Sequence, residues 1–176
     1  WAFRGPQLNT RAKDMSFLLD QIQARKNLGE PFWQHISTAK VGIFGHSFGG
    51  ATSILTAALD PRITAVIALD GWMVPVPPQT LEAGLNVPML YIGQPVWKGT
   101  PLNYEKLDLL ISNSTGSSKK LLIEATKHMD FSDAPQFSNF AKRIGYAGKI
   151  SSSELKEILN GETLKFFNTH IRGQGK

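Results

Sequence analysis

Hydrophobic residues along this chain form two kinds of segment, continuous apolar runs and stretches with helical spacing. The apolar runs predict strands buried on both faces of a parallel sheet, over residues 39–44, 63–69, 87–92 and 120–124. Helical spacing predicts helices before, between and after these strands, over residues 8–23, 49–59, 104–112 and 151–170. Alternating strands and helices predict an α/β fold in which a predominantly parallel sheet is flanked by helices.

Local signals add detail to this pattern. Asn9 or Thr10 is a candidate cap for the first helix, and residues 151–154, Ser-Ser-Ser-Glu, match a capping box for the last one. The Asn-Gly pair at residues 160–161 predicts that the last helix is interrupted or kinked there. The proline-rich segment 72–78 predicts a stiff, apolar loop.

A short glycine-rich motif links the first predicted strand to the helix that follows it. Residues 45–50 read Gly-His-Ser-Phe-Gly-Gly and fit the pattern Gly-x-Ser-x-Gly of a nucleophile elbow. The glycines allow a tight turn that lifts the Ser47 hydroxyl clear of the sheet. The backbone N–H of Phe48 then faces the oxyanion from the start of a helix. The alternative is a glycine-rich turn without catalysis, so the motif needs partners elsewhere in the chain.

A serine nucleophile requires a base, and the chain holds four histidines. His128 comes shortly after the last predicted strand, where an α/β-hydrolase places its base. His46 is too close to Ser47 in the sequence to act on its hydroxyl. His35 lies in a predicted loop, and His170 lies near the end of the last helix.

The base requires an orienting acid, and Asp70 is the candidate because it ends the second predicted strand. Its carboxylate is expected at the edge of the sheet that also carries the nucleophile. The commoner position for the acid follows the next strand, where the chain has the neutral Gln94. Asp130 and Asp133 are more simply a helix cap and a first-turn acid. The resulting order, nucleophile, acid, base, is that of the α/β-hydrolases.

Composition and charge exclude several other classes of protein. The chain has 176 residues, no cysteine and a net charge of +5, with 19 Lys and Arg against 14 Asp and Glu. It therefore has no thiolate chemistry, and its scattered cations do not form a nucleic-acid site. A weak attraction to anionic lipid surfaces stays open. We expect no transmembrane segment, metal, cofactor or obligate protein partner, while secreted and cytoplasmic locations both stay open.

The motifs together resemble a known family. Residues 45–52 and 68–73 (Ala-Leu-Asp-Gly-Trp-Met), with His128 followed by Phe131 and Asp133, resemble the platelet-activating factor acetylhydrolase family of the plasma and type II kind. The resemblance runs from about residue 7 to residue 171. It implies Ca²⁺-independent ester hydrolysis through an acyl-enzyme.

The resemblance assigns Ser47 as nucleophile, His128 as base and Asp70 as orienter. It also has one large departure, because that family has several strands before the elbow strand and a loop there that supplies a second oxyanion donor. We therefore expect residues 1–176 to be a single α/β-hydrolase domain that lacks its N-terminal strands. The start of the chain, Trp-Ala-Phe-Arg without Met or a leader, also indicates a processed or incomplete N-terminus.

The expected substrate is a small ester or a phospholipid. We expect a preference for short or oxidised acyl esters, such as the sn-2 ester of platelet-activating-factor-like lipids. Two alternatives stay open: a general carboxylesterase, lipase or polyester hydrolase, and an inactive remnant of the fold that only binds or assembles. His46, Trp72 and Met73 are the candidate pocket residues, and the loop that begins at Trp72 is the expected wall of an acyl pocket.

Overall fold

Four parallel strands form the centre of the molecule. The computed structural model describes residues 3–97, 99–133, 135 and 140–173. The strands follow one another in the order β1-β2-β3-β4 across the sheet, and every neighbouring pair is parallel. Their bounds are β1 Val41–His46, β2 Ile63–Leu69, β3 Met89–Gly93 and β4 Ser118–Leu122.

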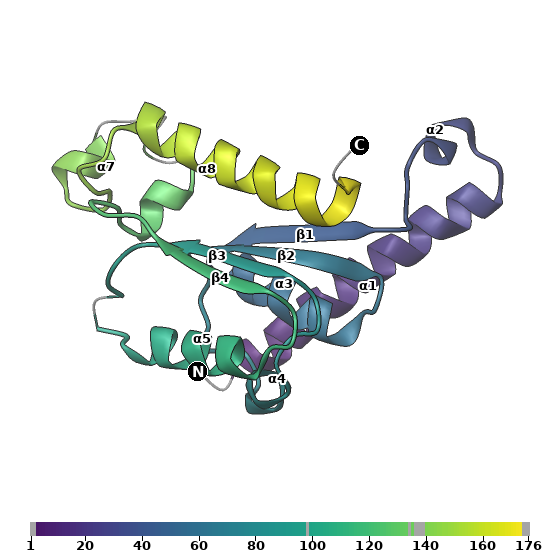
Figure 1. Cartoon of the computed structure of the whole chain (residues 1–176), viewed down its shortest axis with the longest axis horizontal. Coiled ribbons are helices and arrows are strands. Elements are labelled where there is room, and N and C mark those ends of the chain that lie inside the picture. Colours follow the sequence, from purple (N-terminus) through teal and green to yellow (C-terminus); the bar gives the residue numbers. More distant parts are fainter. Residues whose placement is uncertain (1–2, 98, 134, 136–139, 174–176) are drawn as a thin grey trace.

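Helices cover both faces of this sheet (Figure 1). One face carries most of the helices, and α8 crosses the other face. The helices are α1 Arg4–Asn27, α2 Pro31–Gln34, α3 Phe48–Leu59, α4 Pro78–Ala83, α5 Leu102–Asn113, α7 Phe140–Arg143 and α8 Ser152–Phe167. The 3₁₀ turn η1 spans His128–Phe131, and the π-helical turn η2, Asn168–Arg172, continues α8. None of the described helices is long and apolar enough to cross a bilayer. The predicted α/β architecture is confirmed.

The sheet register brings the carboxyl ends of the strands side by side. His46 at the end of β1 pairs with Leu69 at the end of β2, and Leu69 pairs with Ile92 of β3. The residues that follow β1 and β2 therefore leave the sheet at the same edge. Open parallel sheets bind ligands at this edge, so the register places the predicted nucleophile and acid together.

The larger core lies on the face covered by α3. This helix is almost wholly buried because it lies between the sheet and α1, which packs Leu8 and Ala12 into the same cluster. The hydroxyls of Thr52, Ser53 and Thr56 donate to carbonyls one turn earlier in α3. These polar side chains can therefore be buried without loss of hydrogen bonds.

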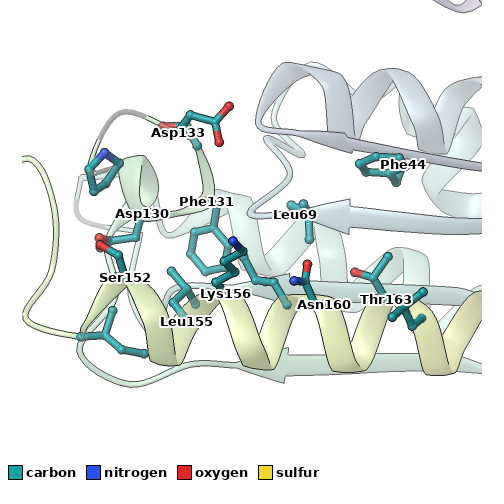
Figure 2. Close-up of a pocket in the computed structure, with 15 residues that line it drawn as sticks. Phe44, Leu69, Asp130, Phe131, Asp133, Ser152, Leu155, Lys156, Asn160 and Thr163 are labelled. Atoms are coloured by element: carbon teal, nitrogen blue, oxygen red, sulfur yellow. The ribbon is translucent and has the colours of Figure 1, made fainter. Parts of the chain in front are cut away.

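The face covered by α8 is less completely filled. Phe167 packs directly on Gly42 of β1, where a Cβ would lie 2.5 Å from the phenyl ring. A groove of about 590 Å³ remains between α8, the sheet and η1. Figure 2 shows Phe44 and Leu69 on the sheet side of this groove, with Leu155 and Thr163 on the α8 side.

Two helices differ in part from the sequence predictions. Helix α1 begins at Arg4, so Thr10 lies inside it and donates to the Pro6 carbonyl at 3.1 Å instead of capping. Proline is tolerated in a first helical turn, which lets the helix start earlier. Helix α8 has its predicted cap, since Ser151 accepts from the Glu154 N–H at 3.1 Å. It runs unbroken through residues 160–161, because a single exposed glycine lowers helix stability without ending the helix.

Candidate active site

The turn after β1 holds Ser47 in a strained conformation at the start of α3. Its φ of 57° and ψ of −119° lie outside the regions that non-glycine residues normally occupy. The Ser47 N–H donates to the Leu69 carbonyl at 3.0 Å, so the turn is held to the end of β2. The sequence therefore folds locally as a sharp strand-to-helix turn, as the elbow motif predicts.

Two glycines make this turn possible. A Cβ on Gly45 would lie 2.5 Å from the backbone of Gly49, and one on Gly50 would lie 2.8 Å from the Cα of Gly71. A Cβ on Gly49 would meet nothing within 4 Å. Of the two motif glycines that flank the serine, Gly45 is therefore sterically required and Gly49 is not. The second required glycine is Gly50.

Phe48 is the first residue of α3, so its backbone N–H belongs to the helix turn that lacks intrahelical acceptors. Such groups, with the positive end of the helix dipole, favour negative charge beside them. The predicted oxyanion role of Phe48 is compatible with this position and stays a prediction.

Asp70 follows β2 directly and is completely buried. Its carboxylate accepts from the Gln94 backbone N–H at 3.1 Å and from the Gln94 side-chain amide at 2.8 Å. The Trp97 indole N–H donates to the same group at 3.0 Å. These donors compensate the cost of burying a charged group. Burial and the nearby carboxylate together raise the pKa of Tyr91 far above its ordinary value, so its hydroxyl stays protonated beside Asp70.

His128 begins η1 and reaches both other residues of the predicted triad. Its Nδ1 lies 2.6 Å from Asp70 Oδ2, and its Nε2 lies 2.9 Å from Ser47 Oγ. A carboxylate can only accept, so Nδ1 carries the proton and Nε2 of the neutral ring accepts from the serine hydroxyl. The hydrogen bond predicted between Asp70 and His128 is therefore present, at the short end of the expected range.

Two aromatic rings flank the His128 imidazole. The His46 ring lies 4.6 Å from it between centroids, and the Trp97 ring lies 4.9 Å from it. His46 Nε2 donates to the His128 carbonyl at 3.1 Å. Burial, and next the nearby His128, lower the pKa of His46 below its ordinary value, which favours the neutral ring that makes this contact.

The acids after His128 take no direct part in this arrangement. Asp130 is buried and accepts from the backbone N–H groups of Lys127 at 2.7 Å and Gly148 at 2.5 Å. Asp133 is exposed at the rim of the groove in Figure 2. Asp130 thus caps its turn, as predicted, and also ties that turn to the segment before α8.

The loop after Asp70 contributes less to a pocket than predicted. Met73 is completely buried in the core and its N–H donates to Asn103 at 2.7 Å, so it has no surface for a substrate. Trp72 keeps a position beside the predicted nucleophile, because its N–H donates to the Ser47 carbonyl at 2.9 Å and its ring lies 5.9 Å from the Phe48 ring between centroids.

A cavity of about 760 Å³ lies on the other side of the site, beside His128. Its walls include Val96, Trp97, Met129 and Tyr146. Sequence reasoning did not find these residues, nor the contacts of Gln94 and Trp97 with Asp70. The only available signal was the position of Gln94 at the end of β3. Within the described part of the chain, no group of three or more potential ligands could hold a metal.

Comparisons with known proteins give a consistent result. The family model described as platelet-activating factor acetylhydrolase, isoform II, matches residues 7–174. The chain is 32% identical over 145 residues to a platelet-activating factor acetylhydrolase from Gallus gallus, covering 79% of this chain and 34% of that one. It is 28% identical over 184 residues to one from Canis lupus familiaris, covering 96% and 40%.

A solved structure is similar as well. The ferulic acid esterase from Streptomyces cinnamoneus matches with a TM-score of 0.78 and 28% identity, covering 98% of this chain and 51% of that one. The chain thus spans between a third and about half of the length of these proteins.

Proposed function

The chain belongs to the platelet-activating factor acetylhydrolase family, isoform II, and we propose that it is a serine carboxylic-ester hydrolase working through an acyl-enzyme. The observation that carries this proposal is the hydrogen-bonded path from Ser47 through His128 to Asp70. The similarity to platelet-activating factor acetylhydrolases and to a ferulic acid esterase supports ester hydrolysis as the reaction class.

In the proposed acylation step, the Ser47 Oγ attacks the ester carbonyl carbon while its proton passes to His128 Nε2. The carbonyl oxygen becomes an oxyanion, for which the Phe48 N–H is the proposed donor. When the tetrahedral intermediate collapses, the bond to the alcohol breaks and the alcohol oxygen takes the proton from Nε2. Asp70 stays ionised throughout and stabilises the imidazolium.

Deacylation repeats these roles with water as the nucleophile. His128 Nε2 accepts a proton from water, the hydroxide oxygen bonds to the acyl carbon, and the Ser47 Oγ leaves with the proton that Nε2 returns. The His128 side chain is 32% exposed, so water can reach the ring. No metal or cofactor is needed to balance these steps.

We propose esters with a short or oxidised acyl group as substrates, including the sn-2 ester of platelet-activating-factor-like phospholipids. The cavity beside His128 has the volume of a ligand site and mostly apolar walls. On the other side of the nucleophile, the guanidinium carbons of Arg4 and Arg11 lie 6.0 and 5.0 Å from the centre of the Phe48 ring. Two exposed cations beside the site support a substrate that carries a phosphate.

A general carboxylesterase is the second candidate. The aromatic side chains of Trp97 and Tyr146 in the wall of the cavity, and the likeness to a ferulic acid esterase, favour this candidate. The first candidate function needs a phosphate on the substrate and the second does not. Activity on neutral and phosphate-bearing esters therefore distinguishes them.

The reaction class is tested by labelling the chain with a fluorophosphonate probe and locating the adduct by mass spectrometry. We expect the adduct on Ser47 and no adduct in Ser47→Ala. Absence of labelling in the wild type, together with no turnover of any ester, would leave the inactive remnant as the correct interpretation.

The substrate class is tested with esters of two to twelve acyl carbons, methyl ferulate and a 2-acetyl glycerophosphocholine. We expect the double variant Arg4→Gln, Arg11→Gln to lose activity on the phosphate-bearing ester alone. Arg25→Gln is the matched control, because Arg25 lies over the Trp33 ring at the other end of α1. Equal losses on neutral esters would favour the general carboxylesterase.

A further inference from the structure

Trp97 contacts two of the three residues in the proposed triad, although it belongs to none of the motifs that identify the site. Its indole N–H donates to Asp70 Oδ1 at 3.0 Å. Its ring meets the His128 imidazole edge-on, with 4.9 Å between centroids and planes inclined by 62°. One side chain therefore bears on both the position of the acid and the position of the base.

The loop that carries Trp97 is held at both ends. On one side, the backbone and side chain of Gln94 donate to Asp70, and the Tyr104 hydroxyl donates to the Gln94 carbonyl. On the other side, the Thr100 N–H donates to the Trp97 carbonyl at 3.2 Å, and the Thr100 carbonyl accepts from the Asn103 N–H in α5 at 3.0 Å. The indole is thus presented to Asp70 by a loop with its own hydrogen bonds to the fold, which lowers the entropy lost in keeping it there.

Core packing alone does not account for this arrangement. The Trp97 ring is partly exposed and lines the cavity of about 760 Å³ together with His128. A tryptophan that served only to fill the core would not need to direct its N–H at a buried carboxylate beside an open cavity. Buried indole N–H groups find a partner, but here the partner is the proposed catalytic acid.

The imidazole is enclosed by these contacts. His46 lies against it from the end of β1, and Trp97 lies against it from the loop after β3. Asp70 binds its Nδ1, which leaves Nε2 directed at Ser47. The ring has little freedom to rotate about its side-chain bonds while both neighbours are in place.

We propose that Trp97 is a positioning residue: its indole N–H orients the Asp70 carboxylate, and its ring keeps the His128 imidazole directed at Ser47. Its kinetic consequence rests on the proposed esterase function, whereas its structural consequence does not. A further implication is that any ester occupying the cavity beside His128 touches the residue that orders the acid and base.

Trp97→Phe is the decisive variant, because it keeps an aromatic ring beside His128 and removes the indole N–H, together with part of the ring. We expect kcat on a small neutral ester to fall about tenfold, as for loss of one hydrogen bond to a charged group, with KM within twofold. We also expect the acid limb of the pH profile of kcat/KM to move upward by about half a pH unit. A carboxylate with one donor fewer holds the imidazolium proton more strongly.

The pH readout separates positioning from packing. The charged or titratable groups that face His128 are Asp70 and His46, and the neighbouring Lys127 amine is engaged with the Gly145 carbonyl. None of these is altered by the substitution. Trp33→Phe is the matched control, since Trp33 packs on Phe32 in α2, and we expect wild-type kinetics from it. A uniform loss of activity with an unmoved acid limb would overturn the proposal, as would wild-type kinetics in Trp97→Phe.

A second readout does not depend on turnover. The chain has four tryptophans, and ¹⁵N-labelled indole resolves their N–H signals by NMR. The signal lost in Trp97→Phe should move as His128 titrates and should shift strongly in Asp70→Asn. If the wild type hydrolyses no ester but this signal behaves as expected, the proposed function fails and the positioning contact stands. A Trp97 signal that shifts neither with the titration of His128 nor in Asp70→Asn would refute the contact itself.

Discussion

The two sides of His128 differ in how completely they are built into the fold. On the acid side, Asp70 is fully buried and accepts N–H groups from Gln94, Trp97 and His128. On the nucleophile side, Ser47 is only partly buried and stands beside a half-buried Phe48. The difference indicates that Asp70, the proposed acid, is also a structural element, whereas Ser47, the proposed nucleophile, is positioned by the backbone and left accessible.

The largest effect is expected from Ser47→Ala, which tests the nucleophile side of His128. We expect kcat to fall by about 10⁶-fold, because the covalent route is lost and only binding and oxyanion contacts remain. The free energy of unfolding should change by no more than about 0.5 kcal/mol, since the hydroxyl contributes little packing. Steady-state kinetics and urea denaturation measure the two quantities. A variant that keeps a tenth of wild-type turnover would disprove the nucleophile assignment.

Asp70→Asn tests the acid side of His128. Its effect should appear both in the steady-state kinetics and in the urea denaturation. We expect kcat to fall by about 10⁴-fold because an amide can favour the wrong imidazole tautomer. Unlike Ser47→Ala, it should also lower the free energy of unfolding by about 1–3 kcal/mol. Each carboxylate oxygen accepts two N–H groups, and an amide nitrogen in either place would face donors.

The matched control for that variant is Asp133→Asn, because Asp133 is exposed and lies in the same region of the chain as His128. It should match the wild type in both measurements. Should Asp70→Asn prove as stable as wild type, the contrast between the two sides of His128 would be lost.

Gly50→Ala tests how the backbone holds the nucleophile. Its Cβ would lie 2.8 Å from Gly71 Cα and 3.1 Å from the Gly45 carbonyl oxygen, so α3 must move away from the turn after β2. We expect a loss of about 1–3 kcal/mol in the free energy of unfolding, as for overpacking. Gly49→Ala has open space around its Cβ and should be close to wild type. Equal stability of the two variants in thermal and urea unfolding would contradict this account of the turn.

The smallest effect is expected at His46, whose ring lies against the His128 imidazole. Its pKa is lowered in the folded state from the ordinary value of 6.5, so below that pH the unfolded chain binds more protons than the folded chain. Stability should therefore fall as the pH drops from about 6.5 toward the folded-state pKa. His46→Gln keeps an amide donor for the His128 carbonyl and removes this titration.

The measurement is the free energy of unfolding at pH 7 and pH 5, in wild type and variant. The variant should lose less stability between these values, by less than about 1 kcal/mol. A steeper loss in the variant would show that the sign is wrong.

Sequence reasoning succeeded where backbone periodicity places the residues. The apolar run that became β2 and the elbow motif after β1 are local signals, and parallel register then brings Ser47 and Asp70 to one edge. It failed for Gln94 and Trp97, because which loop side chains turn toward a carboxylate depends on the path of the loop in space. It also misjudged Met73, since a hydrophobic residue after a strand can enter the core or line a pocket with the same spacing.

Three non-glycine residues among those described have positive φ angles, namely Ser47 (57°), Asp70 (41°) and Ala125 (59°). All three follow closely on strands that lead into the site, and such conformations cost about 1–3 kcal/mol each. Two carry side chains of the proposed triad, but Ala125 contributes through its carbonyl, which accepts the N–H groups of Lys149 and Ile150. Ala125 is therefore the position where an engineer can exchange alanine for glycine and raise thermal tolerance without altering a reacting group. A laboratory selection for heat resistance should arrive at this position and spare the other two.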